Sequence, residues 1–269
     1  MFVKKMGAIV KERFIDEFER GLVSIITPAY NVENVIDETI SNVLRQTYTN
    51  WELILVDDCS SDNTLEVCRS YQNNNSNVFV YTNSMNSGSG HTRNVALKKA
   101  KGQYVAFLDS DDIWDRRKLE NQLRFMKEND AAICHTSFSF VDEDGRKRPG
   151  KVNATSIVDL ESNLRNTEIG TSTAIINRDL VKETFLFSNI RARQDLKLWI
   201  DLLSSGYVSH GLDEMLVEYR VRENSVSSNK LKMLAVTLKV YLGVDSLPFY
   251  KRLSCYVSYV LNAIKKRRR

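Results

Sequence analysis

Apolar runs alternate with amphipathic patterns along the first half of the chain, and this alternation constrains the fold more than any other feature. Residues 22–27, 51–58, 77–82 and 103–109 are short, largely apolar runs of the kind found in buried strands. The segments between them have helical spacing, clearest where one helix face carries Ile36, Ile40, Val43 and Leu44. Strands that alternate with helices predict an α/β fold with a mostly parallel central sheet flanked by helices.

Polar and glycine residues indicate where several elements begin and end. Asn34 is a candidate N-cap for the first helix, and a helix over residues 91–100 is expected to end at Gly102 as a C′ residue. After Ile133 the pattern predicts a strand with a turn at Asp144-Gly145. A strand within residues 170–178, a helix over 194–206 and a last strand over 212–224 are expected to follow.

Composition divides the 269 residues into three segments. Residues 1–20 have an amphipathic spacing that predicts a short N-terminal helix, and residues 21–229 form the main α/β domain. Residues 230–269 contain ten Lys or Arg and one acid, a formal charge of +9, so residues 1–229 carry −5 of the total of +4. A basic, helical C-terminal segment therefore follows a mildly acidic domain.

Several classes of protein do not fit this sequence. The N-terminal residues lack the sustained apolar region of a signal peptide, and no apolar run reaches the roughly 18–20 residues that span a bilayer. The four cysteines form no C-x-x-C pair, and the three histidines lack zinc-ligand spacing. We expect a cytoplasmic protein with reduced thiols that is not an integral membrane protein.

Three predicted strands end in polar clusters, at residues 27–31, 56–64 and 108–112. The carboxyl ends of parallel strands meet at one edge of a sheet, where ligands of such folds bind. Asp109 and Asp111 have a D-x-D spacing, which suits ligation of Mg2+ or Mn2+ together with a diphosphate. An alternative is that Asp111 or Asp112 caps a helix beginning near Arg116, but the two companion clusters favour the metal–diphosphate interpretation.

Four motifs together carry a resemblance to a known family: "VSIITPAYN", "WELILVDDCSSDNT", "NSGSGHTRNVAL" and "GQYVAFLDSDD". In order and spacing they resemble the family-2 glycosyltransferases of the GT-A fold, over residues 23–112 with weaker similarity to about residue 228. The resemblance implies transfer of a sugar from a nucleotide diphosphate-sugar to an acceptor hydroxyl, with inversion at the anomeric carbon. Residues 21–229 would then be the catalytic domain.

The resemblance assigns roles on the donor side. Thr27, Ala29 and Tyr30 correspond to the wall beside the base, and Asp58 to the carboxylate that accepts the uracil N–H, which implies a UDP-sugar. An alternative for Asp58 is turn formation with Ser60 and Ser61. In the D-x-D motif, Asp109 would lie near the ribose and sugar, Asp111 would bind Mn2+ or Mg2+, and Ser110 between them would also line the donor site.

Three arginines in these motifs have two interpretations each. Gly88 and Gly90 would let the backbone pass close to the donor, and Arg93 would either contact the diphosphate or brace the D-x-D loop. Arg220 and Arg222, with Ser225, would close over the diphosphate or be surface charges of the last strand.

An inverting transfer also needs a general base for the acceptor hydroxyl. The family places it in an "E-D" pair that opens a late helix, and this chain has Gln194 and Asp195 there. The resemblance therefore implies Asp195 as the base, while Gln194 departs from the family pattern at the neighbouring acceptor contact. The alternative is an acid that only favours the helix N-terminus.

The basic segment contains an apolar stretch, residues 253–264, with Lys and Arg on both sides of it. Twelve residues cannot span a bilayer but can lie in an anionic interface, so we expect peripheral binding to the inner face of a bacterial cytoplasmic membrane. A nucleic-acid arm is not favoured because nothing accompanies it to read bases. The other alternative is a helix packed on the catalytic domain.

The leading hypothesis is an inverting, metal-dependent hexosyltransferase that moves a hexose or N-acetylhexosamine from a UDP-sugar to a lipid-linked glycan. Its product would be a surface polysaccharide such as capsule, O-antigen or teichuronic acid, and a homo-oligomer stays open. A sugar-nucleotide pyrophosphorylase is the second hypothesis, but it would carry a glycine-rich loop after the first strand, where this chain has "TPAYNVEN". A non-catalytic sugar-nucleotide-binding scaffold is the third.

Overall fold

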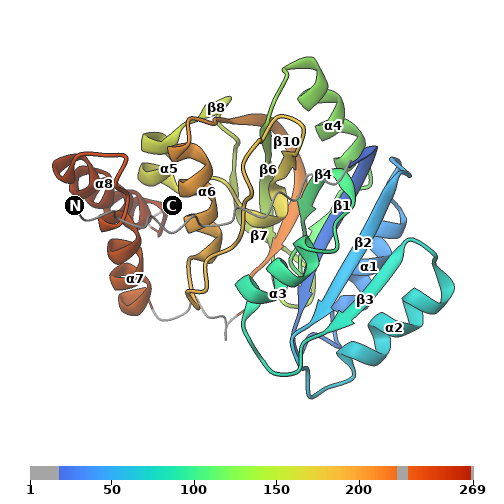
Figure 1. The fold of residues 1–269 in the computed structure, drawn as a ribbon. Coiled ribbons are helices and arrows are strands. Elements are labelled where there is room, and N and C mark those ends of the chain that lie inside the picture. The colour runs from blue at the N-terminus through green and yellow to red at the C-terminus, as the bar shows by residue number, and fades with distance from the viewer. Residues whose placement is uncertain (1–17, 223–229, 268–269) are drawn as a thin grey trace, which may run out of the picture.

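One sheet of ten strands organises the chain in the computed structural model, which describes residues 18–222 and 230–267 (Figure 1). The strand order is β3-β2-β1-β4-β9-β6-β10-β5, with β7 beside β6 and β8 beside β10. The strands are β1 Glu19–Ala29, β2 Trp51–Asp57, β3 Val78–Thr82, β4 Gly102–Phe107, β5 Ile113–Trp114, β6 Ile133–Val141, β7 Lys147–Val152, β8 Ile157–Val158, β9 Ile175–Asn177 and β10 Ser209–Arg220.

Six of these strands run in the same direction. β1 pairs in parallel with β2 and β4, β2 with β3, and β6 with β10, and the antiparallel strand β9 joins β4 to β6. The carboxyl ends of β1, β2, β4, β6 and β10 therefore lie at one edge. The predicted α/β fold with a mostly parallel sheet is confirmed.

Helices cover both faces of the sheet. The helices are α1 Ile36–Leu44, α2 Thr64–Asn74, α3 Ser89–Leu97, α4 Lys118–Glu128, α5 Leu160–Asn166, α6 Gln194–Ser204, α7 Lys230–Leu242 and α8 Phe249–Arg267, with a 3-10 turn at Thr171–Thr173. Alternate residues of each central strand face opposite layers. Ile25 and Leu53 pack with α1 and α4, whereas Ile26 and Ile54 pack with α3 and α6. Because both faces of the sheet are buried, the sequences of its central strands are continuous apolar runs.

Some predicted boundaries were wrong. Helix α1 follows Val35 without a side-chain cap, so Asn34 is not its N-cap, and Leu44 is partly exposed. Helix α3 ends at Leu97, and Gly102 opens strand β4 instead of closing the helix. A Cβ at Gly102 would lie 2.5 Å from the Leu22 carbonyl oxygen, so close strand packing is what requires glycine there. The strand expected within 170–178 is a 3-10 turn followed by the short strand β9.

The C-terminal helices α7 and α8 pack against α5 and α6. Val240, Tyr241 and Tyr259 of α7 and α8 share a buried cluster with Leu164 of α5 and Leu196 of α6. This pair, the α7–α8 hairpin, lies at the end of the molecule opposite α2 (Figure 1). Within the described residues no helix is long and apolar enough to cross a membrane. Most of the predicted N-terminal helix lies outside the described residues, and its last two positions, Glu19 and Arg20, belong to β1.

Candidate active site

The three polar strand ends meet, as predicted. The Asp58 amide donates to the Ala29 carbonyl at 2.8 Å, and the Leu108 amide donates to the Ile26 carbonyl at 3.0 Å. The first and second clusters are also linked because the Asn31 amide donates to Ser60 Oγ at 3.0 Å. The sheet edge thus carries residues 27–31, 58–64 and 108–112 side by side.

The residues predicted to form the nucleotide wall differ in exposure. Thr27 is 0% and Ala29 1% exposed, so both side chains are covered, whereas Tyr30 is 47% exposed. Tyr30 is therefore the member of this trio with ring surface available to a planar base, and Thr27 and Ala29 lie beneath it in the strand.

Asp58 is buried and organises the loop before α3. Its carboxylate accepts hydrogen bonds from Asn83 Nδ2 at 2.7 Å and from the amides of Ser87 and Gly88 at 2.9 and 2.7 Å. Burial alone would raise the pKa of Asp58, but these hydrogen bonds outweigh it and hold the pKa below its usual value. The turn role considered for Asp58 belongs instead to Asp57, which accepts from the Ser60 amide at 3.1 Å.

Arg93 braces the D-x-D loop. Its guanidinium is 6% exposed and forms an ion pair with Asp109, and it also lies 5.1 Å from the centre of the Phe187 ring. Its Nε and Nη1 atoms have no hydrogen-bond partner among the described residues. Of the two predicted roles, loop bracing is the one that this structure contains.

Asp112 is a structural residue of the loop. It is 1% exposed and accepts hydrogen bonds from Ser172 Oγ at 2.5 Å and from the Arg220 amide at 3.0 Å. Burial, then the charges of Asp111 and Asp109, raises its pKa well above the usual value. The capping alternative is wrong, because strand β5 follows the loop and α4 begins only at Lys118.

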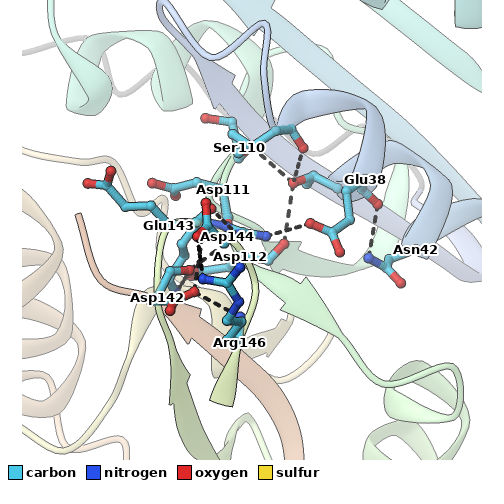
Figure 2. Close-up of polar contacts among 12 residues, drawn as sticks. Glu38, Asn42, Ser110, Asp111, Asp112, Asp142, Glu143, Asp144 and Arg146 are labelled. Atoms are coloured by element: carbon cyan, nitrogen blue, oxygen red, sulfur yellow. Dashed lines mark hydrogen bonds and ion pairs between the residues drawn. The ribbon is translucent and has the colours of Figure 1, made fainter. Parts of the chain in front are cut away.

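Arg220 holds this loop to two other elements. Its side chain is 3% exposed, and its Nε donates to the Asp111 carbonyl at 2.8 Å. Its Nη1 donates to the Glu143 carbonyl at 2.7 Å, and Nη2 pairs with Glu38 at 2.5 Å. Figure 2 shows Glu38 of α1, the loop residues Ser110, Asp111 and Asp112, and the turn after β6 gathered in one place. A guanidinium occupied in this way is not free to close over a diphosphate, and Ser225 lies outside the described residues.

Of the three aspartates in the D-x-D loop, Asp111 is the one most available to a ligand, since Asp109 pairs with Arg93 and Asp112 is buried. Its side chain is 23% exposed, and its nearest basic partner is Arg222 at 3.7 Å. Burial and the neighbouring charge of Asp109 raise the pKa of Asp111 to about 6. The described residues contain no cluster of three or more His, Cys, Asp or Glu that could enclose a metal on their own. A cation here would need oxygen ligands from a second molecule.

Asp195 reaches the same edge from the other side. It lies in the first turn of α6, and Thr171 Oγ1 donates to it at 3.5 Å. Its neighbour Gln194 donates to Ser89 Oγ at 2.5 Å, which a glutamate could not do while ionised. The turn at Thr171–Thr173 connects the two sides, because Ser172 Oγ accepts from the Asp109 amide at 3.0 Å and the neighbouring Thr171 is the donor to Asp195.

Two residues of this site were not predicted for the roles they have. Ser172 holds the Asp109 amide and the Asp112 carboxylate, and Arg220 holds the backbone of the D-x-D loop. The sequence "GTST" before β9 carried a usable signal, because Gly, Ser and Thr clusters favour turns over strands.

The fold and the site define the class of protein. Residues 24–185, more than half of the chain, match the family described as Glycosyl transferase family 2. The chain belongs to this family and is a glycosyltransferase.

Two named relatives match this chain over nearly their whole length. The chain is 42% identical over 248 residues to a Bacillus subtilis protein named as a teichuronic acid biosynthesis glycosyltransferase, TuaG, covering 92% of this chain and 98% of that one. It is 35% identical over 246 residues to the Escherichia coli UDP-Glc:alpha-D-GlcNAc-diphosphoundecaprenol beta-1,3-glucosyltransferase WfgD, covering 91% and 94%.

Solved structures confirm the GT-A architecture. TarS of S. aureus in complex with UDP-GlcNAc superposes with a TM-score of 0.70 at 24% identity, over 90% of this chain and 72% of that one. The mannosyltransferase PcManGT of Pyrobaculum calidifontis, in complex with GDP-Man and Mn2+, gives a TM-score of 0.66 at 18% identity, over 90% and 73%.

Proposed function

We propose that this glycosyltransferase moves a hexose or N-acetylhexosamine from a UDP-sugar to a hydroxyl of a lipid-linked glycan, with inversion, in synthesis of a bacterial surface polysaccharide. One observation carries the proposal. The 3-10 turn Thr171–Thr173 brings the D-x-D loop and Asp195 together at the carboxyl edge of the sheet, because Ser172 accepts from the Asp109 amide and Thr171 donates to the Asp195 carboxylate. That arrangement supplies a base on one side of the turn and a diphosphate-binding loop on the other.

The loop fits a divalent cation of the Mg2+ or Mn2+ type. Asp111 has a raised pKa because it lies beside Asp109 in a partly buried site, and a cation would relieve that repulsion. Such ions are commonly held by one or two carboxylates together with substrate phosphates, so a cage of protein ligands is not required. Asp111 would hold the ion, and the bound ion would supply charge stabilisation for the departing diphosphate.

The chain's own residues supply the remaining steps. Asp195 accepts the proton of the acceptor hydroxyl as that oxygen attacks the anomeric carbon, and the bond to the diphosphate oxygen breaks. Arg93 keeps Asp109 in place beside the donor, and Arg220 keeps the loop backbone fixed. Fixed geometry of this kind lowers the barrier because the reacting groups need not be ordered during the reaction.

Donor and acceptor are assigned from chemistry and from relatives. Tyr30 offers an exposed ring, with Thr27 and Ala29 beneath it and Ser110 in the D-x-D loop. Asp58 is assigned to the imide N–H of uracil from the family resemblance, and the hydrogen bonds from Asn83, Ser87 and Gly88 keep its carboxylate ionised as an acceptor. WfgD uses UDP-Glc and a diphosphoundecaprenol-linked acceptor by its name, and we extend both classes to this chain.

A panel of UDP-, GDP- and dTDP-sugars tests the donor assignment by thermal shift. UDP-sugars with Mn2+ are expected to raise the melting temperature of the wild type by mass action, and Asp111→Asn is expected to abolish the Mn2+-dependent part. Stabilisation by GDP-sugars and not by UDP-sugars would contradict the assignment of Asp58.

The outer face of α8 supports binding to a membrane surface. Its exposed apolar residues follow helical spacing and form one stripe: Tyr250, Leu253, Val257, Leu261 and Ile264. The opposite face packs on the domain through Cys255 and Tyr259. Helix α8 is therefore compatible with both alternatives from the sequence, membrane binding and packing on the domain. One of its faces packs on the domain, and the other is apolar and exposed. The basic residues at positions 265–269 of the sequence suit anionic lipid, which supports the proposal that the enzyme works at the inner face of the cytoplasmic membrane.

Vesicle flotation tests this surface. Wild-type protein is expected to float with phosphatidylglycerol-containing vesicles, and the double variant Val257→Glu/Leu261→Glu is expected to stay in solution. The matched control places the same two charges on α2, as Asn73→Glu/Asn74→Glu, and should float like the wild type. If the stripe variant floats as well as the control, or if the stripe instead holds two copies together in sedimentation, the membrane proposal is wrong.

A further inference from the structure

Arg193 connects the α7–α8 hairpin to the start of the helix that carries Asp195. It immediately precedes α6, and its backbone is left-handed, with φ 66° and ψ 20°. A non-glycine residue in this region costs about 1 kcal/mol or more, and the surrounding structure must hold it there. The contacts of its side chain identify what holds it.

Two residues of the hairpin hold the Arg193 guanidinium. Nε donates to Thr237 Oγ1 of α7 at 3.0 Å, and Nη2 donates to the Tyr259 hydroxyl of α8 at 2.5 Å. The guanidinium carbon also lies 5.7 Å from the centre of the Tyr259 ring. Thr237 is 0% and Tyr259 9% exposed, so both partners are fixed by packing.

The hairpin also packs on the residue after Asp195. Leu196 is 4% exposed and belongs to the cluster that contains Tyr241 and Tyr259. Asp195 is therefore bracketed along the chain by two residues that the hairpin holds, Arg193 and Leu196. On the other side, Gln194 is held by Ser89 at the start of α3.

We propose that Arg193 is a positioning residue: the α7–α8 hairpin, through Thr237 and Tyr259, holds it in the left-handed conformation that aims Asp195 at the acceptor hydroxyl. This inference rests on the proposed function, since it assumes that Asp195 is the base. It gives the C-terminal hairpin a part in the reaction, besides its apolar outer stripe.

Variants of the two hydroxyls test the connection. Tyr259→Phe combined with Thr237→Val removes both partners of Arg193 and leaves the ring and the side-chain volume. Tyr256→Phe is the matched control, because Tyr256 donates within the hairpin, to the Leu234 carbonyl at 3.1 Å, whereas the hydrogen bonds of the Arg193 guanidinium within the described residues go to Thr237 and Tyr259. Thr237→Ser keeps the hydroxyl and serves as the rescue variant. Arg193→Gly retains access to the left-handed conformation but removes the guanidinium.

Two measurements are made on each variant. UDP release from UDP-glucose and UDP-N-acetylglucosamine with Mn2+ gives kcat and the donor KM. Hydrogen exchange of the first turn of α6 reports its order without any turnover. We expect Tyr259→Phe/Thr237→Val and Arg193→Gly to lower kcat at least ten-fold with the donor KM unchanged, and to speed exchange in that turn. Tyr256→Phe and Thr237→Ser should match the wild type in both.

The proposal is overturned if the double variant keeps wild-type exchange in the first turn of α6, or keeps wild-type kcat. Asp195→Asn separates this failure from failure of the proposed function. If Asp195→Asn is inactive while the double variant is fully active, the hairpin does not position the base. If Asp195→Asn is itself active, Asp195 is not the base and both proposals are wrong.

Discussion

The backbone amide of Arg220 donates to the carboxylate of Asp112 at 3.0 Å, while the side chain of the same arginine donates to the Asp111 carbonyl at 2.8 Å. The last strand of the domain thus holds the D-x-D loop by two hydrogen bonds from one residue. Since the guanidinium also reaches α1 and the turn after β6, three elements far apart in sequence converge on it.

Arg220→Met is expected to destabilise the protein by about 3 kcal/mol, because removing one partner leaves buried acceptors without a donor. Arg222→Met is the matched control. Its side chain is 41% exposed with one ion pair at 3.7 Å, so its loss should cost less than about 1 kcal/mol. Urea denaturation of both variants measures the difference, and equal midpoints would contradict the role assigned to Arg220.

Asp111→Asn is expected to stabilise the metal-free protein above pH 6. The pKa of Asp111 is raised to about 6 in the folded protein, so the folded state binds its proton more tightly than the unfolded state does. Stability from this group is present below about pH 4 and is lost as the pH rises through 6, and the variant avoids that loss.

Thermal melts of the wild type and Asp111→Asn in chelator, at pH 4 and pH 8, test this expectation. The two proteins should melt together at pH 4, and the variant should melt higher at pH 8. A variant that melts lower than the wild type at pH 8 would show that the carboxylate is stabilising and that the repulsion is not real.

Lys118 is a buried cation whose removal is expected to stabilise the fold. It is 0% exposed, its Nζ donates to Gln122 at 2.7 Å, and it lies 4.2 Å from the centre of the Trp114 ring. Burial lowers its pKa to about 7, so the unfolded state binds its proton more tightly and stability rises between pH 7 and about 10. Lys118→Met should gain ~1 kcal/mol or more at pH 7, and the gain should shrink by pH 9.5 in urea titrations. A stability gain that stays the same at both pH values, or a Lys118→Met variant less stable than the wild type at pH 7, would refute this.

Gly90→Ala is expected to destabilise the contact between α3 and the segment before α6. A Cβ at this position would lie 2.8 Å from the Ser188 carbonyl oxygen and 3.1 Å from Gln194 Cγ. Overpacking of this kind costs about 1–3 kcal/mol. Gly243→Ala is the control, because its Cβ would lie 3.5 Å from the Val240 carbonyl oxygen, and it should change stability by less than about 0.5 kcal/mol. Similar melting temperatures for the two variants would show that the site relaxes freely.

The sequence was sufficient for the parallel sheet and for the meeting of three polar strand ends. Both follow from local signals, since apolar runs define buried strands and parallel strands share one carboxyl edge. The short strand β5 was missed, and β9 was predicted too long, because two or three residues carry no periodicity and depend on their neighbours in space.

Roles set by long-range contacts could not be predicted. Arg220 lies 109 residues from Asp111 and Arg193 lies 66 residues from Tyr259, and no local pattern encodes either contact. The sequence left a capping role open for Asp112, and its contact with Ser172 shows that it supports the loop instead. The sequence identified which residues reach the edge, and packing decides which of them face a ligand.

The most direct test of the central claim is UDP release from UDP-glucose and UDP-N-acetylglucosamine in the presence of Mn2+, compared between Asp195→Asn and Asp201→Asn. Asp201 lies on the same helix, and its exposed carboxylate pairs only with Lys197 among the described residues. We predict that Asp195→Asn lowers kcat by 10²–10⁴-fold with the donor KM unchanged, and that Asp201→Asn matches the wild type. Wild-type turnover by Asp195→Asn would contradict the account, as would UDP binding by the wild type with no turnover at all.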